Sequence, residues 1–108
     1  MPWTVHLLNA AVEAEIAALP ADMRARYLRL ADLIEAYGLE RIGAPHVKHL
    51  EGRLWELRIT GRDGIARAIY VTASGQRVVV LHAFIKKTQK TPARALDTAR
   101  RRLRELDP

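Results

Sequence analysis

The sequence predicts a small α+β domain with the element order β-α-α-β-β-β-α. Three observations predict it. Before Gly38 apolar side chains recur every three or four positions, which is typical of amphipathic helices. After Gly38 the spacing changes to about two, between short turns. A last stripe with helical spacing ends the chain. We therefore expect an N-terminal helical hairpin packed on a small, mainly antiparallel sheet with a C-terminal helix.

The length and composition limit the classes of protein to be considered. The chain has 108 residues, so we expect residues 1–108 to form a single domain. It has no cysteine, which excludes disulfides, thiolate metal sites and cysteine nucleophiles and fits a reducing compartment. The longest stretch without a formal charge, Met1–Val12, is shorter than a membrane span. We expect a cytoplasmic protein that does not bind a membrane.

The first elements are a strand and a helix. Trp3–Leu7 alternates briefly between apolar and polar residues, as a short strand does. Asn9 is placed to cap a helix over Ala10–Leu19, because its side chain can accept from a free amide of the first turn. Pro20 ends this helix.

The second helix carries the clearest apolar stripe. Asp22 is expected to be its N-cap, and Gly38 is expected to end it in a left-handed conformation. A break this short between two helices predicts an antiparallel hairpin. The stripe has spacings of four, three, four and three, and consists of Met23, Tyr27, Leu30, Ile34 and Tyr37.

The middle of the chain is expected to form a β-meander. Gly61–Gly64 and Ser74-Gly75 have the composition of tight turns, so the strands beside them are antiparallel neighbours. Val47–Leu50 could add a short strand. The clearer strands are Leu54–Ile59, Ile65–Thr72 and Arg77–Phe84.

The C-terminal helix is predicted to begin at Thr91, as N-cap, and Pro92, at the first helical position. Its apolar stripe consists of Leu96, Ala99, Leu103 and Leu106. Four arginines are expected to lie largely off that stripe, namely Arg94, Arg100, Arg101 and Arg104.

Positive charge is concentrated in the second half of the chain. Residues 1–50 hold five basic and six acidic side chains, a net charge of −1, whereas residues 51–108 hold thirteen and six, a net charge of +7. This asymmetry suggests a polyanion or an acidic protein as partner. A basic surface without a function is the alternative.

Two strand arginines are candidates for a phosphate site. Arg67 shares its strand face with apolar residues, so either Glu56 or Asp63 pairs with it or the face opens onto a site that needs a fixed cation. Arg58 belongs to the polar face of the preceding strand, with Glu56, while Trp55, Leu57 and Ile59 form the apolar face. Two arginines on adjacent strands would clamp a phosphate.

The segment from Lys86 to Thr91 offers three lysines, two hydroxyls and a helix N-terminus, which together suit a phosphate; a solvated loop is the alternative. His46 and His49 lack a third ligand, so we expect no metal. His82 lies in an apolar run. It is either a hydrogen-bonded core histidine or a group for proton transfer.

Three segments carry a resemblance to a known family. They are KHLEGRLWELR (Lys48–Arg58), Gly64–Tyr70 with Arg67, and VLHAFIKKTQKTP (Val80–Pro92). They resemble toxins of the RelE/ParE superfamily, and more narrowly the HigB-like, phage-derived branch of type II toxin–antitoxin systems. The order of elements also matches that RelE-like fold. Ala83 stands where the family usually has glycine.

The resemblance implies a metal-independent, ribosome-dependent mRNA endoribonuclease without a cofactor, which uses the neighbouring 2′-hydroxyl as nucleophile. Arg58 and Arg67 would stabilise the pentacoordinate phosphate, and Lys86 and Lys87 would bind phosphate or donate a proton. His82 or a lysine of lowered pKa would be the base. The RNA-binding residues would be Lys48, Lys90 and Thr91.

The implied partners are mRNA on the ribosome and a cognate helix-turn-helix antitoxin whose acidic or amphipathic segment covers the basic face. Two alternatives belong to other classes. ParE-like members of the superfamily inhibit DNA gyrase without cutting RNA, and a non-catalytic binding module would do neither.

Overall fold

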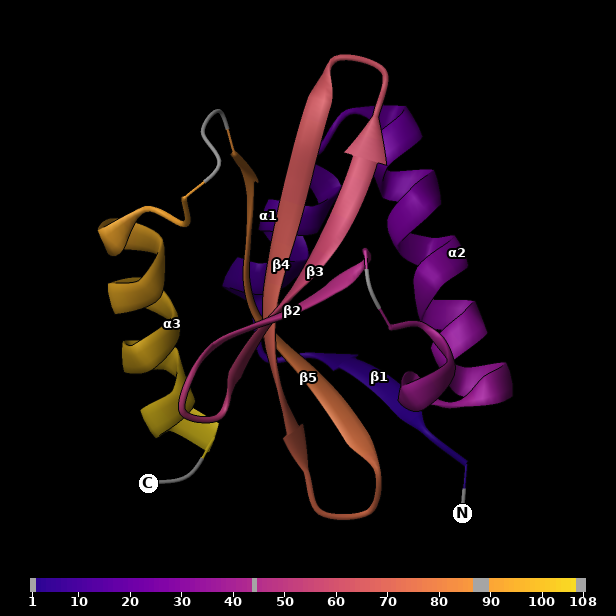
Figure 1. The fold of residues 1–108 in the computed structure, drawn as a ribbon. Helices are drawn as coiled ribbons and strands as arrows, with labels where there is room; N and C mark the ends of the chain where they lie inside the picture. The colour runs from indigo at the N-terminus through magenta and orange to yellow at the C-terminus, as the bar shows by residue number, and fades with distance from the viewer. Residues whose placement is uncertain (1, 44, 87–89, 107–108) are drawn as a thin grey trace.

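The computed structural model describes residues 2–43, 45–86 and 90–106, and it confirms the α+β class (Figure 1). The predicted order lacked one element, because the short strand β2 is also formed. The elements are β1 (Thr4–Leu7), α1 (Ala10–Ala17), α2 (Ala21–Tyr37), a single 3₁₀ turn η1 (Leu39–Arg41), β2 (Val47–Glu51), β3 (Leu54–Gly61), β4 (Gly64–Ala73), β5 (Arg77–Lys86) and α3 (Ala93–Leu106).

The strands form one sheet in the order β1-β5-β4-β3-β2 within the described residues. β2 to β5 are the expected antiparallel meander, whereas β1 runs parallel to β5 at the opposite edge. β1 pairs with Arg77–Val80, so the rest of β5 has no strand of the described residues beside it at that edge.

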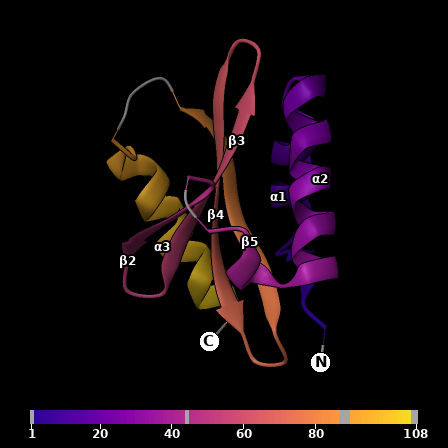
Figure 2. The ribbon, with the colours of Figure 1, turned by 45° about the vertical axis from the view of Figure 1, so that its right-hand side comes forward.

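Helices cover both faces of the sheet: α1 and α2 lie on one face, and α3 lies on the other (Figure 2). We call these the helical-hairpin face and the α3 face. None of the helices in the described ranges is long and apolar enough to cross a membrane.

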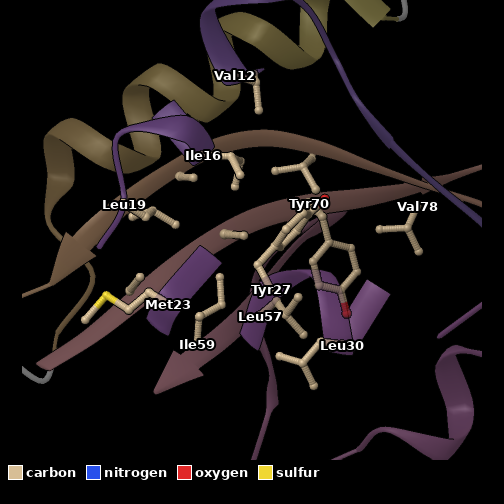
Figure 3. Close-up of a cluster of buried hydrophobic side chains, with 14 of the residues drawn as sticks. Val12, Ile16, Leu19, Met23, Tyr27, Leu30, Leu57, Ile59, Tyr70 and Val78 are labelled. Atoms are coloured by element: carbon tan, nitrogen blue, oxygen red, sulfur yellow. The ribbon is translucent and has the colours of Figure 1, made fainter. Parts of the chain in front are cut away.

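The larger apolar core fills the helical-hairpin face (Figure 3). The predicted stripe of α2 supplies four buried side chains to it, but its fifth member, Tyr37, is 66% exposed at the end of the helix. From the sheet come residues of β3, β4 and β5, among them Leu57, Ile59, Tyr70 and Val78.

The caps of the first two helices differ in outcome. Asn9 caps α1 as predicted, since its Oδ1 accepts from the Val12 amide at 3.1 Å. The prediction for Asp22 was wrong: Pro20 occupies the N-cap of α2, and Asp22 Oδ2 instead accepts from the Arg62 amide at 2.6 Å, in the β3–β4 turn. Gly38 ends α2 with a positive φ of 92°, which favours glycine, although its ψ of 152° lies outside the left-handed helical region.

The α3 face has a smaller apolar core. Ala95 and Ala99 are buried there, and Leu96, Leu103 and Leu106 pack beside them, as the predicted stripe required. The predicted cap was wrong by one residue. The carbonyl of Pro92 accepts from the amides of Ala95 and Leu96, so Pro92 itself precedes the helix and Thr91 is free for another contact.

A β-bulge in β5 decides which side chains reach the α3 face. In the register with β4, Ile69 lies opposite His82 and Tyr70 opposite Val80, which leaves Leu81 as the extra residue. Val78 and Val80 therefore face the hairpin before the bulge, but Phe84 lies on the α3 face after it. β5 also runs two residues longer than predicted, so Lys86 ends a strand and does not begin a loop.

Candidate functional site

Three cations meet on the α3 face near the start of α3. Arg58 of β3 lies opposite Arg67 of β4, and Arg67 lies opposite Phe84 of β5. Lys86, two residues beyond Phe84, lies opposite Ile65. We call Arg58, Arg67 and Lys86 the basic cluster. Since all three sit on strands, the sheet fixes their spacing.

A buried carboxylate lies within this cluster. Arg67 Nη1 donates to Glu56 Oε2 at 3.1 Å, and the two side chains are only 3% and 0% exposed. Glu56 is thus the partner of Arg67, in place of Asp63. Glu56 shares the strand face of Arg58, as predicted, and this face is covered at Glu56, whose side chain is buried on the α3 face. The Thr91 hydroxyl, also buried, donates to Glu56 Oε1 at 3.0 Å.

The basic cluster keeps unused hydrogen-bond donors. Within the described residues, the Nε atoms of Arg58 and Arg67 are buried and have no hydrogen-bond partner. A buried donor without a partner is costly, and such groups are rare outside functional sites. An anionic ligand placed between the two guanidinium groups would satisfy both atoms.

Burial and neighbouring charge lower the pKa of Lys86. The largest cause is desolvation; Glu56 opposes it, and Arg67, Lys48 and Arg58 act in the same direction as burial. Burial likewise lowers the pKa of Arg67, with Glu56 again opposing. A lysine of lowered pKa gives up its proton more readily than an exposed one, which suits it to proton transfer.

His82 is held by a second ion-pair network. Its Nδ1 lies 3.0 Å from Glu15 Oε1, and Glu15 also accepts from Arg102 Nη1 at 3.0 and 2.9 Å and from the Ala83 amide at 3.0 Å. Burial acts to raise the pKa of Glu15, but the hydrogen bonds from Ala83, His82 and Arg102 together lower it below 4.5. With Nδ1 turned to Glu15, Nε2 is the ring nitrogen left for other chemistry.

A cavity of about 580 Å³ lies between β5 and the first turns of α3. His82 and Phe84 form one wall, with their rings stacked at 5.1 Å between centroids and an interplanar angle of 24°. The other wall is formed by Pro92, Arg94, Ala95 and Thr98, and Ile85 completes the lining. Phe84 and Pro92 neighbour the Arg67–Glu56–Thr91 network, so the cavity adjoins the basic cluster.

The sequence model of the family described as "Phage derived protein Gp49-like (DUF891)" matches residues 14–104, most of the chain. The protein belongs to this Gp49-like family. The Gp49-like family is a RelE/HigB-like toxin family, so the resemblance found in the sequence is confirmed. No curated protein matches this Gp49-like chain.

A solved structure supports the fold of the Gp49-like protein. The chain is similar to one in the crystal structure of the archaeal RelE-RelB complex from Pyrococcus horikoshii OT3, with a TM-score of 0.62 and 21% sequence identity. The similarity covers 81% of this chain and 98% of that chain. At this identity the likeness shows a RelE-like fold.

The remaining predicted site residues of the Gp49-like protein are placed as follows. Lys48, opposite Glu56 in the register of β2 and β3, and Lys90 are exposed, whereas Thr91 is buried with its hydroxyl on Glu56. Lys87 lies outside the described residues. Ala83 packs in the core of the helical-hairpin face, where its methyl group is accommodated and its amide donates to Glu15.

No group of three metal-ligating side chains occurs in the ranges that the structure describes. His49 Nε2 lies 2.9 Å from the Gly52 carbonyl oxygen, and the His49 ring meets Trp55 edge-on.

Sequence reasoning missed Glu56 and Glu15 as parts of the site. Glu56 was weighed only as a partner for Arg67, and its bond to Thr91 spans 35 residues. Glu15 lies 67 residues from His82, and no spacing in the sequence links them. One signal was available for Glu56: it shares a strand face with Leu54 and with Arg58, two residues before and after it.

Proposed function

We propose that this Gp49-like protein is the toxin of a type II toxin–antitoxin system and acts as a metal-independent mRNA endoribonuclease. The observation that carries the proposal is the basic cluster, in which two arginines have buried Nε donors without a partner among the described residues, beside a buried lysine. A phosphodiester is the ligand that this arrangement fits, because two planar guanidinium groups can bind its oxygens together.

In the proposed reaction Arg58 and Arg67 hold the scissile phosphate. The neighbouring 2′-oxygen attacks phosphorus, forms a P–O2′ bond and passes its proton to a base. The P–O5′ bond breaks, and the leaving 5′-oxygen receives a proton from an acid. The products are a 2′,3′-cyclic phosphate and a 5′-hydroxyl. The charge that develops on the phosphate oxygens is stabilised by the two arginines.

β5 supplies a base and an acid on two sides of this phosphate. His82 and Lys86 are four residues apart, about 13 Å along an extended strand, and Phe84, the residue opposite Arg67, lies midway between them. Attack and departure in line require the base and the acid on opposite sides of phosphorus. We assign the proton acceptor to His82 Nε2, oriented by Glu15, and the proton donor to Lys86.

The cavity beside the basic cluster supports RNA as the substrate. Its stacked His82 and Phe84 rings offer a flat wall for a nucleobase, and Arg94 adds a cation at its lining. The excess positive charge after residue 50 suits a polyanion. We extend the proposal to mRNA on the ribosome as substrate, which places the protein in the cytoplasm, and to Lys48, Lys87 and Lys90 as further phosphate contacts.

The proposed protein partner is a cognate antitoxin, with a helix-turn-helix domain and an acidic or amphipathic segment. The similar archaeal chain comes from a RelE-RelB complex, which supports a partner for this fold. Charge complementarity to the basic half of the chain would speed and orient the association.

The test is to induce the protein in cells and map RNA 5′ ends, and to incubate purified protein with ribosomes and mRNA. Wild type should give new 5′-hydroxyl ends in both. His82→Gln and Lys86→Met should each lower the cleavage rate about 10²- to 10⁴-fold, the range for general acid–base groups. Arg26→Gln, on the exposed side of α2, is the matched control and should cleave like wild type.

Other outcomes would overturn the proposal. Growth arrest with DNA damage and no new RNA ends would indicate a gyrase inhibitor, and no arrest would indicate a binding module. Cleavage that survives both substitutions would refute the assignment of acid and base.

A further inference from the structure

Glu56 is used on both of its oxygens, by two parts of the chain that are far apart in sequence. Oε2 accepts from Arg67 of β4, and Oε1 accepts from Thr91, which stands two residues before α3. Its own strand, β3, carries Arg58 two residues further on. One buried carboxylate therefore joins the strands that hold the arginines to the start of the last helix.

Thr91 does not cap α3, and its hydroxyl binds Glu56 instead. A threonine before a helix usually accepts from the first-turn amides. Here Pro92 provides the first helical carbonyl, and the Thr91 hydroxyl donates inward to Glu56. The hydroxyl is buried and its proton is committed to the carboxylate.

The charge of the same carboxylate also acts on Lys86. The charged groups that act on the Lys86 ammonium are Glu56 and Arg58 of β3, Arg67 of β4 and Lys48 of β2. Within the described part of the chain, Glu56 is the single anion among them, and it favours the protonated lysine. Lys86 is the last residue of β5 and Thr91 lies two residues before α3, so Glu56 acts on one residue near the end of the sheet and one near the start of the last helix.

We infer that Glu56 and Thr91 are positioning residues of the ribonuclease site: their hydrogen bond fixes the start of α3 against the basic cluster and holds Arg67 and Lys86 in their working geometry. This inference rests on the proposed function. It assigns a role to two buried residues that do not touch RNA in the proposed reaction. Thr91 then acts through Glu56 and is not an RNA ligand.

Thr91→Val removes the donor and keeps the shape. We expect kcat for mRNA cleavage to fall about tenfold to a hundredfold with KM changed less than about threefold, as expected when reacting groups are misplaced by a fraction of an ångström to 1 Å. Thr91→Ser should restore kcat, since it restores the hydroxyl. Thr72→Val, on the exposed part of β4, is the matched control and should behave like wild type.

A second readout does not depend on cleavage. The Arg67 Nε–H signal and the titration of the Lys86 ammonium are followed by NMR in wild type, Thr91→Val and Glu56→Gln. The Arg67 signal should shift or broaden in both variants, and Glu56→Gln should lower the Lys86 pKa because it removes the one anion. Wild type without ribonuclease activity, but with these shifts, would refute the proposed function alone.

Positioning by Glu56 and Thr91 is overturned if Thr91→Val cleaves like wild type, or if Thr91→Ser fails to recover activity. It is equally overturned if both NMR signals are unmoved in folded Glu56→Gln.

Discussion

The two faces of the sheet are built from the same strands but differ in what they bury. The helical-hairpin face is covered by α1 and α2 and holds apolar side chains throughout its core. The α3 face is apolar only where α3 packs, around Ala95 and Ala99. Beyond the start of α3 it buries Glu56, Arg67, Lys86 and Thr91. The face covered by two helices has the larger apolar core, and the face covered by α3 alone has a smaller core and leaves room for a site.

The largest expected effect concerns the ion pair of the α3 face. Arg67→Met leaves the Glu56 carboxylate buried without its partner and should lower the free energy of unfolding by about 3–5 kcal/mol. The triple variant Arg67→Met/Glu56→Leu/Thr91→Val replaces the network by apolar side chains and should recover most of that loss. Both variants should lack ribonuclease activity.

Chemical denaturation and cleavage assays on these variants separate stability from function. An unchanged denaturation midpoint for Arg67→Met would mean that the buried ion pair of the α3 face adds nothing to stability, and would contradict this prediction.

A deletion in the helical-hairpin face should show the opposite pattern. Ile59 is fully buried there, so Ile59→Ala should cost about 2–5 kcal/mol of stability while each folded molecule cleaves RNA as fast as wild type. Leu28→Ala, which alters a side chain that is 60% exposed on α2, is the control and should change stability by less than about 0.5 kcal/mol. Loss of specific activity in folded Ile59→Ala would show that the two faces are coupled.

The smallest expected effect is a difference in pH response. Burial raises the pKa of Tyr27 to about 12, with Glu35 adding to it, so the stability from its protonated form is complete below pH 10 and is lost as pH rises toward 12. The loss should be roughly 1 kcal/mol near pH 10.5, and Tyr27→Phe should remove it. Lys86 has a lowered pKa, so its contribution has the other sign: stability rises with pH between that pKa and 10.5.

Urea denaturation from pH 8.5 to 11, on wild type, Tyr27→Phe and Lys86→Met, measures both slopes. Parallel curves for wild type and Tyr27→Phe would contradict the assignment to Tyr27.

What the sequence predicted correctly depends on local chemistry. Asn9 caps α1 because a side-chain oxygen three residues from a free amide needs no tertiary help, and the stripe from Met23 to Ile34 is buried because a helix repeats every 3.6 residues. Asp22 and Thr91 also had the right residue type for a cap. Instead, the Asp22 side chain accepts from the Arg62 amide and the Thr91 side chain donates to Glu56, and both are tertiary contacts.

The candidate site was predictable in its residues more than in its arrangement. Alternation placed Arg67 on an apolar row and Glu56 on the polar face of its strand, but no sequence pattern shows that the chain returns at Thr91 and binds Glu56. The bulge at Leu81 reverses which face Phe84 and Lys86 occupy, and a single extra residue leaves no signal in a run of apolar side chains.

The edge of β5 beyond β1 has a consequence for how molecules of this protein meet. Strands with open amides and carbonyls invite another chain to pair with them. Here Glu15 accepts from the Ala83 amide, and Arg102 donates to the Leu81 carbonyl at 3.0 Å, so two side chains from α1 and α3 stand in for the missing neighbour. A strand of another molecule could pair with β5 at this point only after displacing both side chains, so these contacts oppose aggregation through strand pairing.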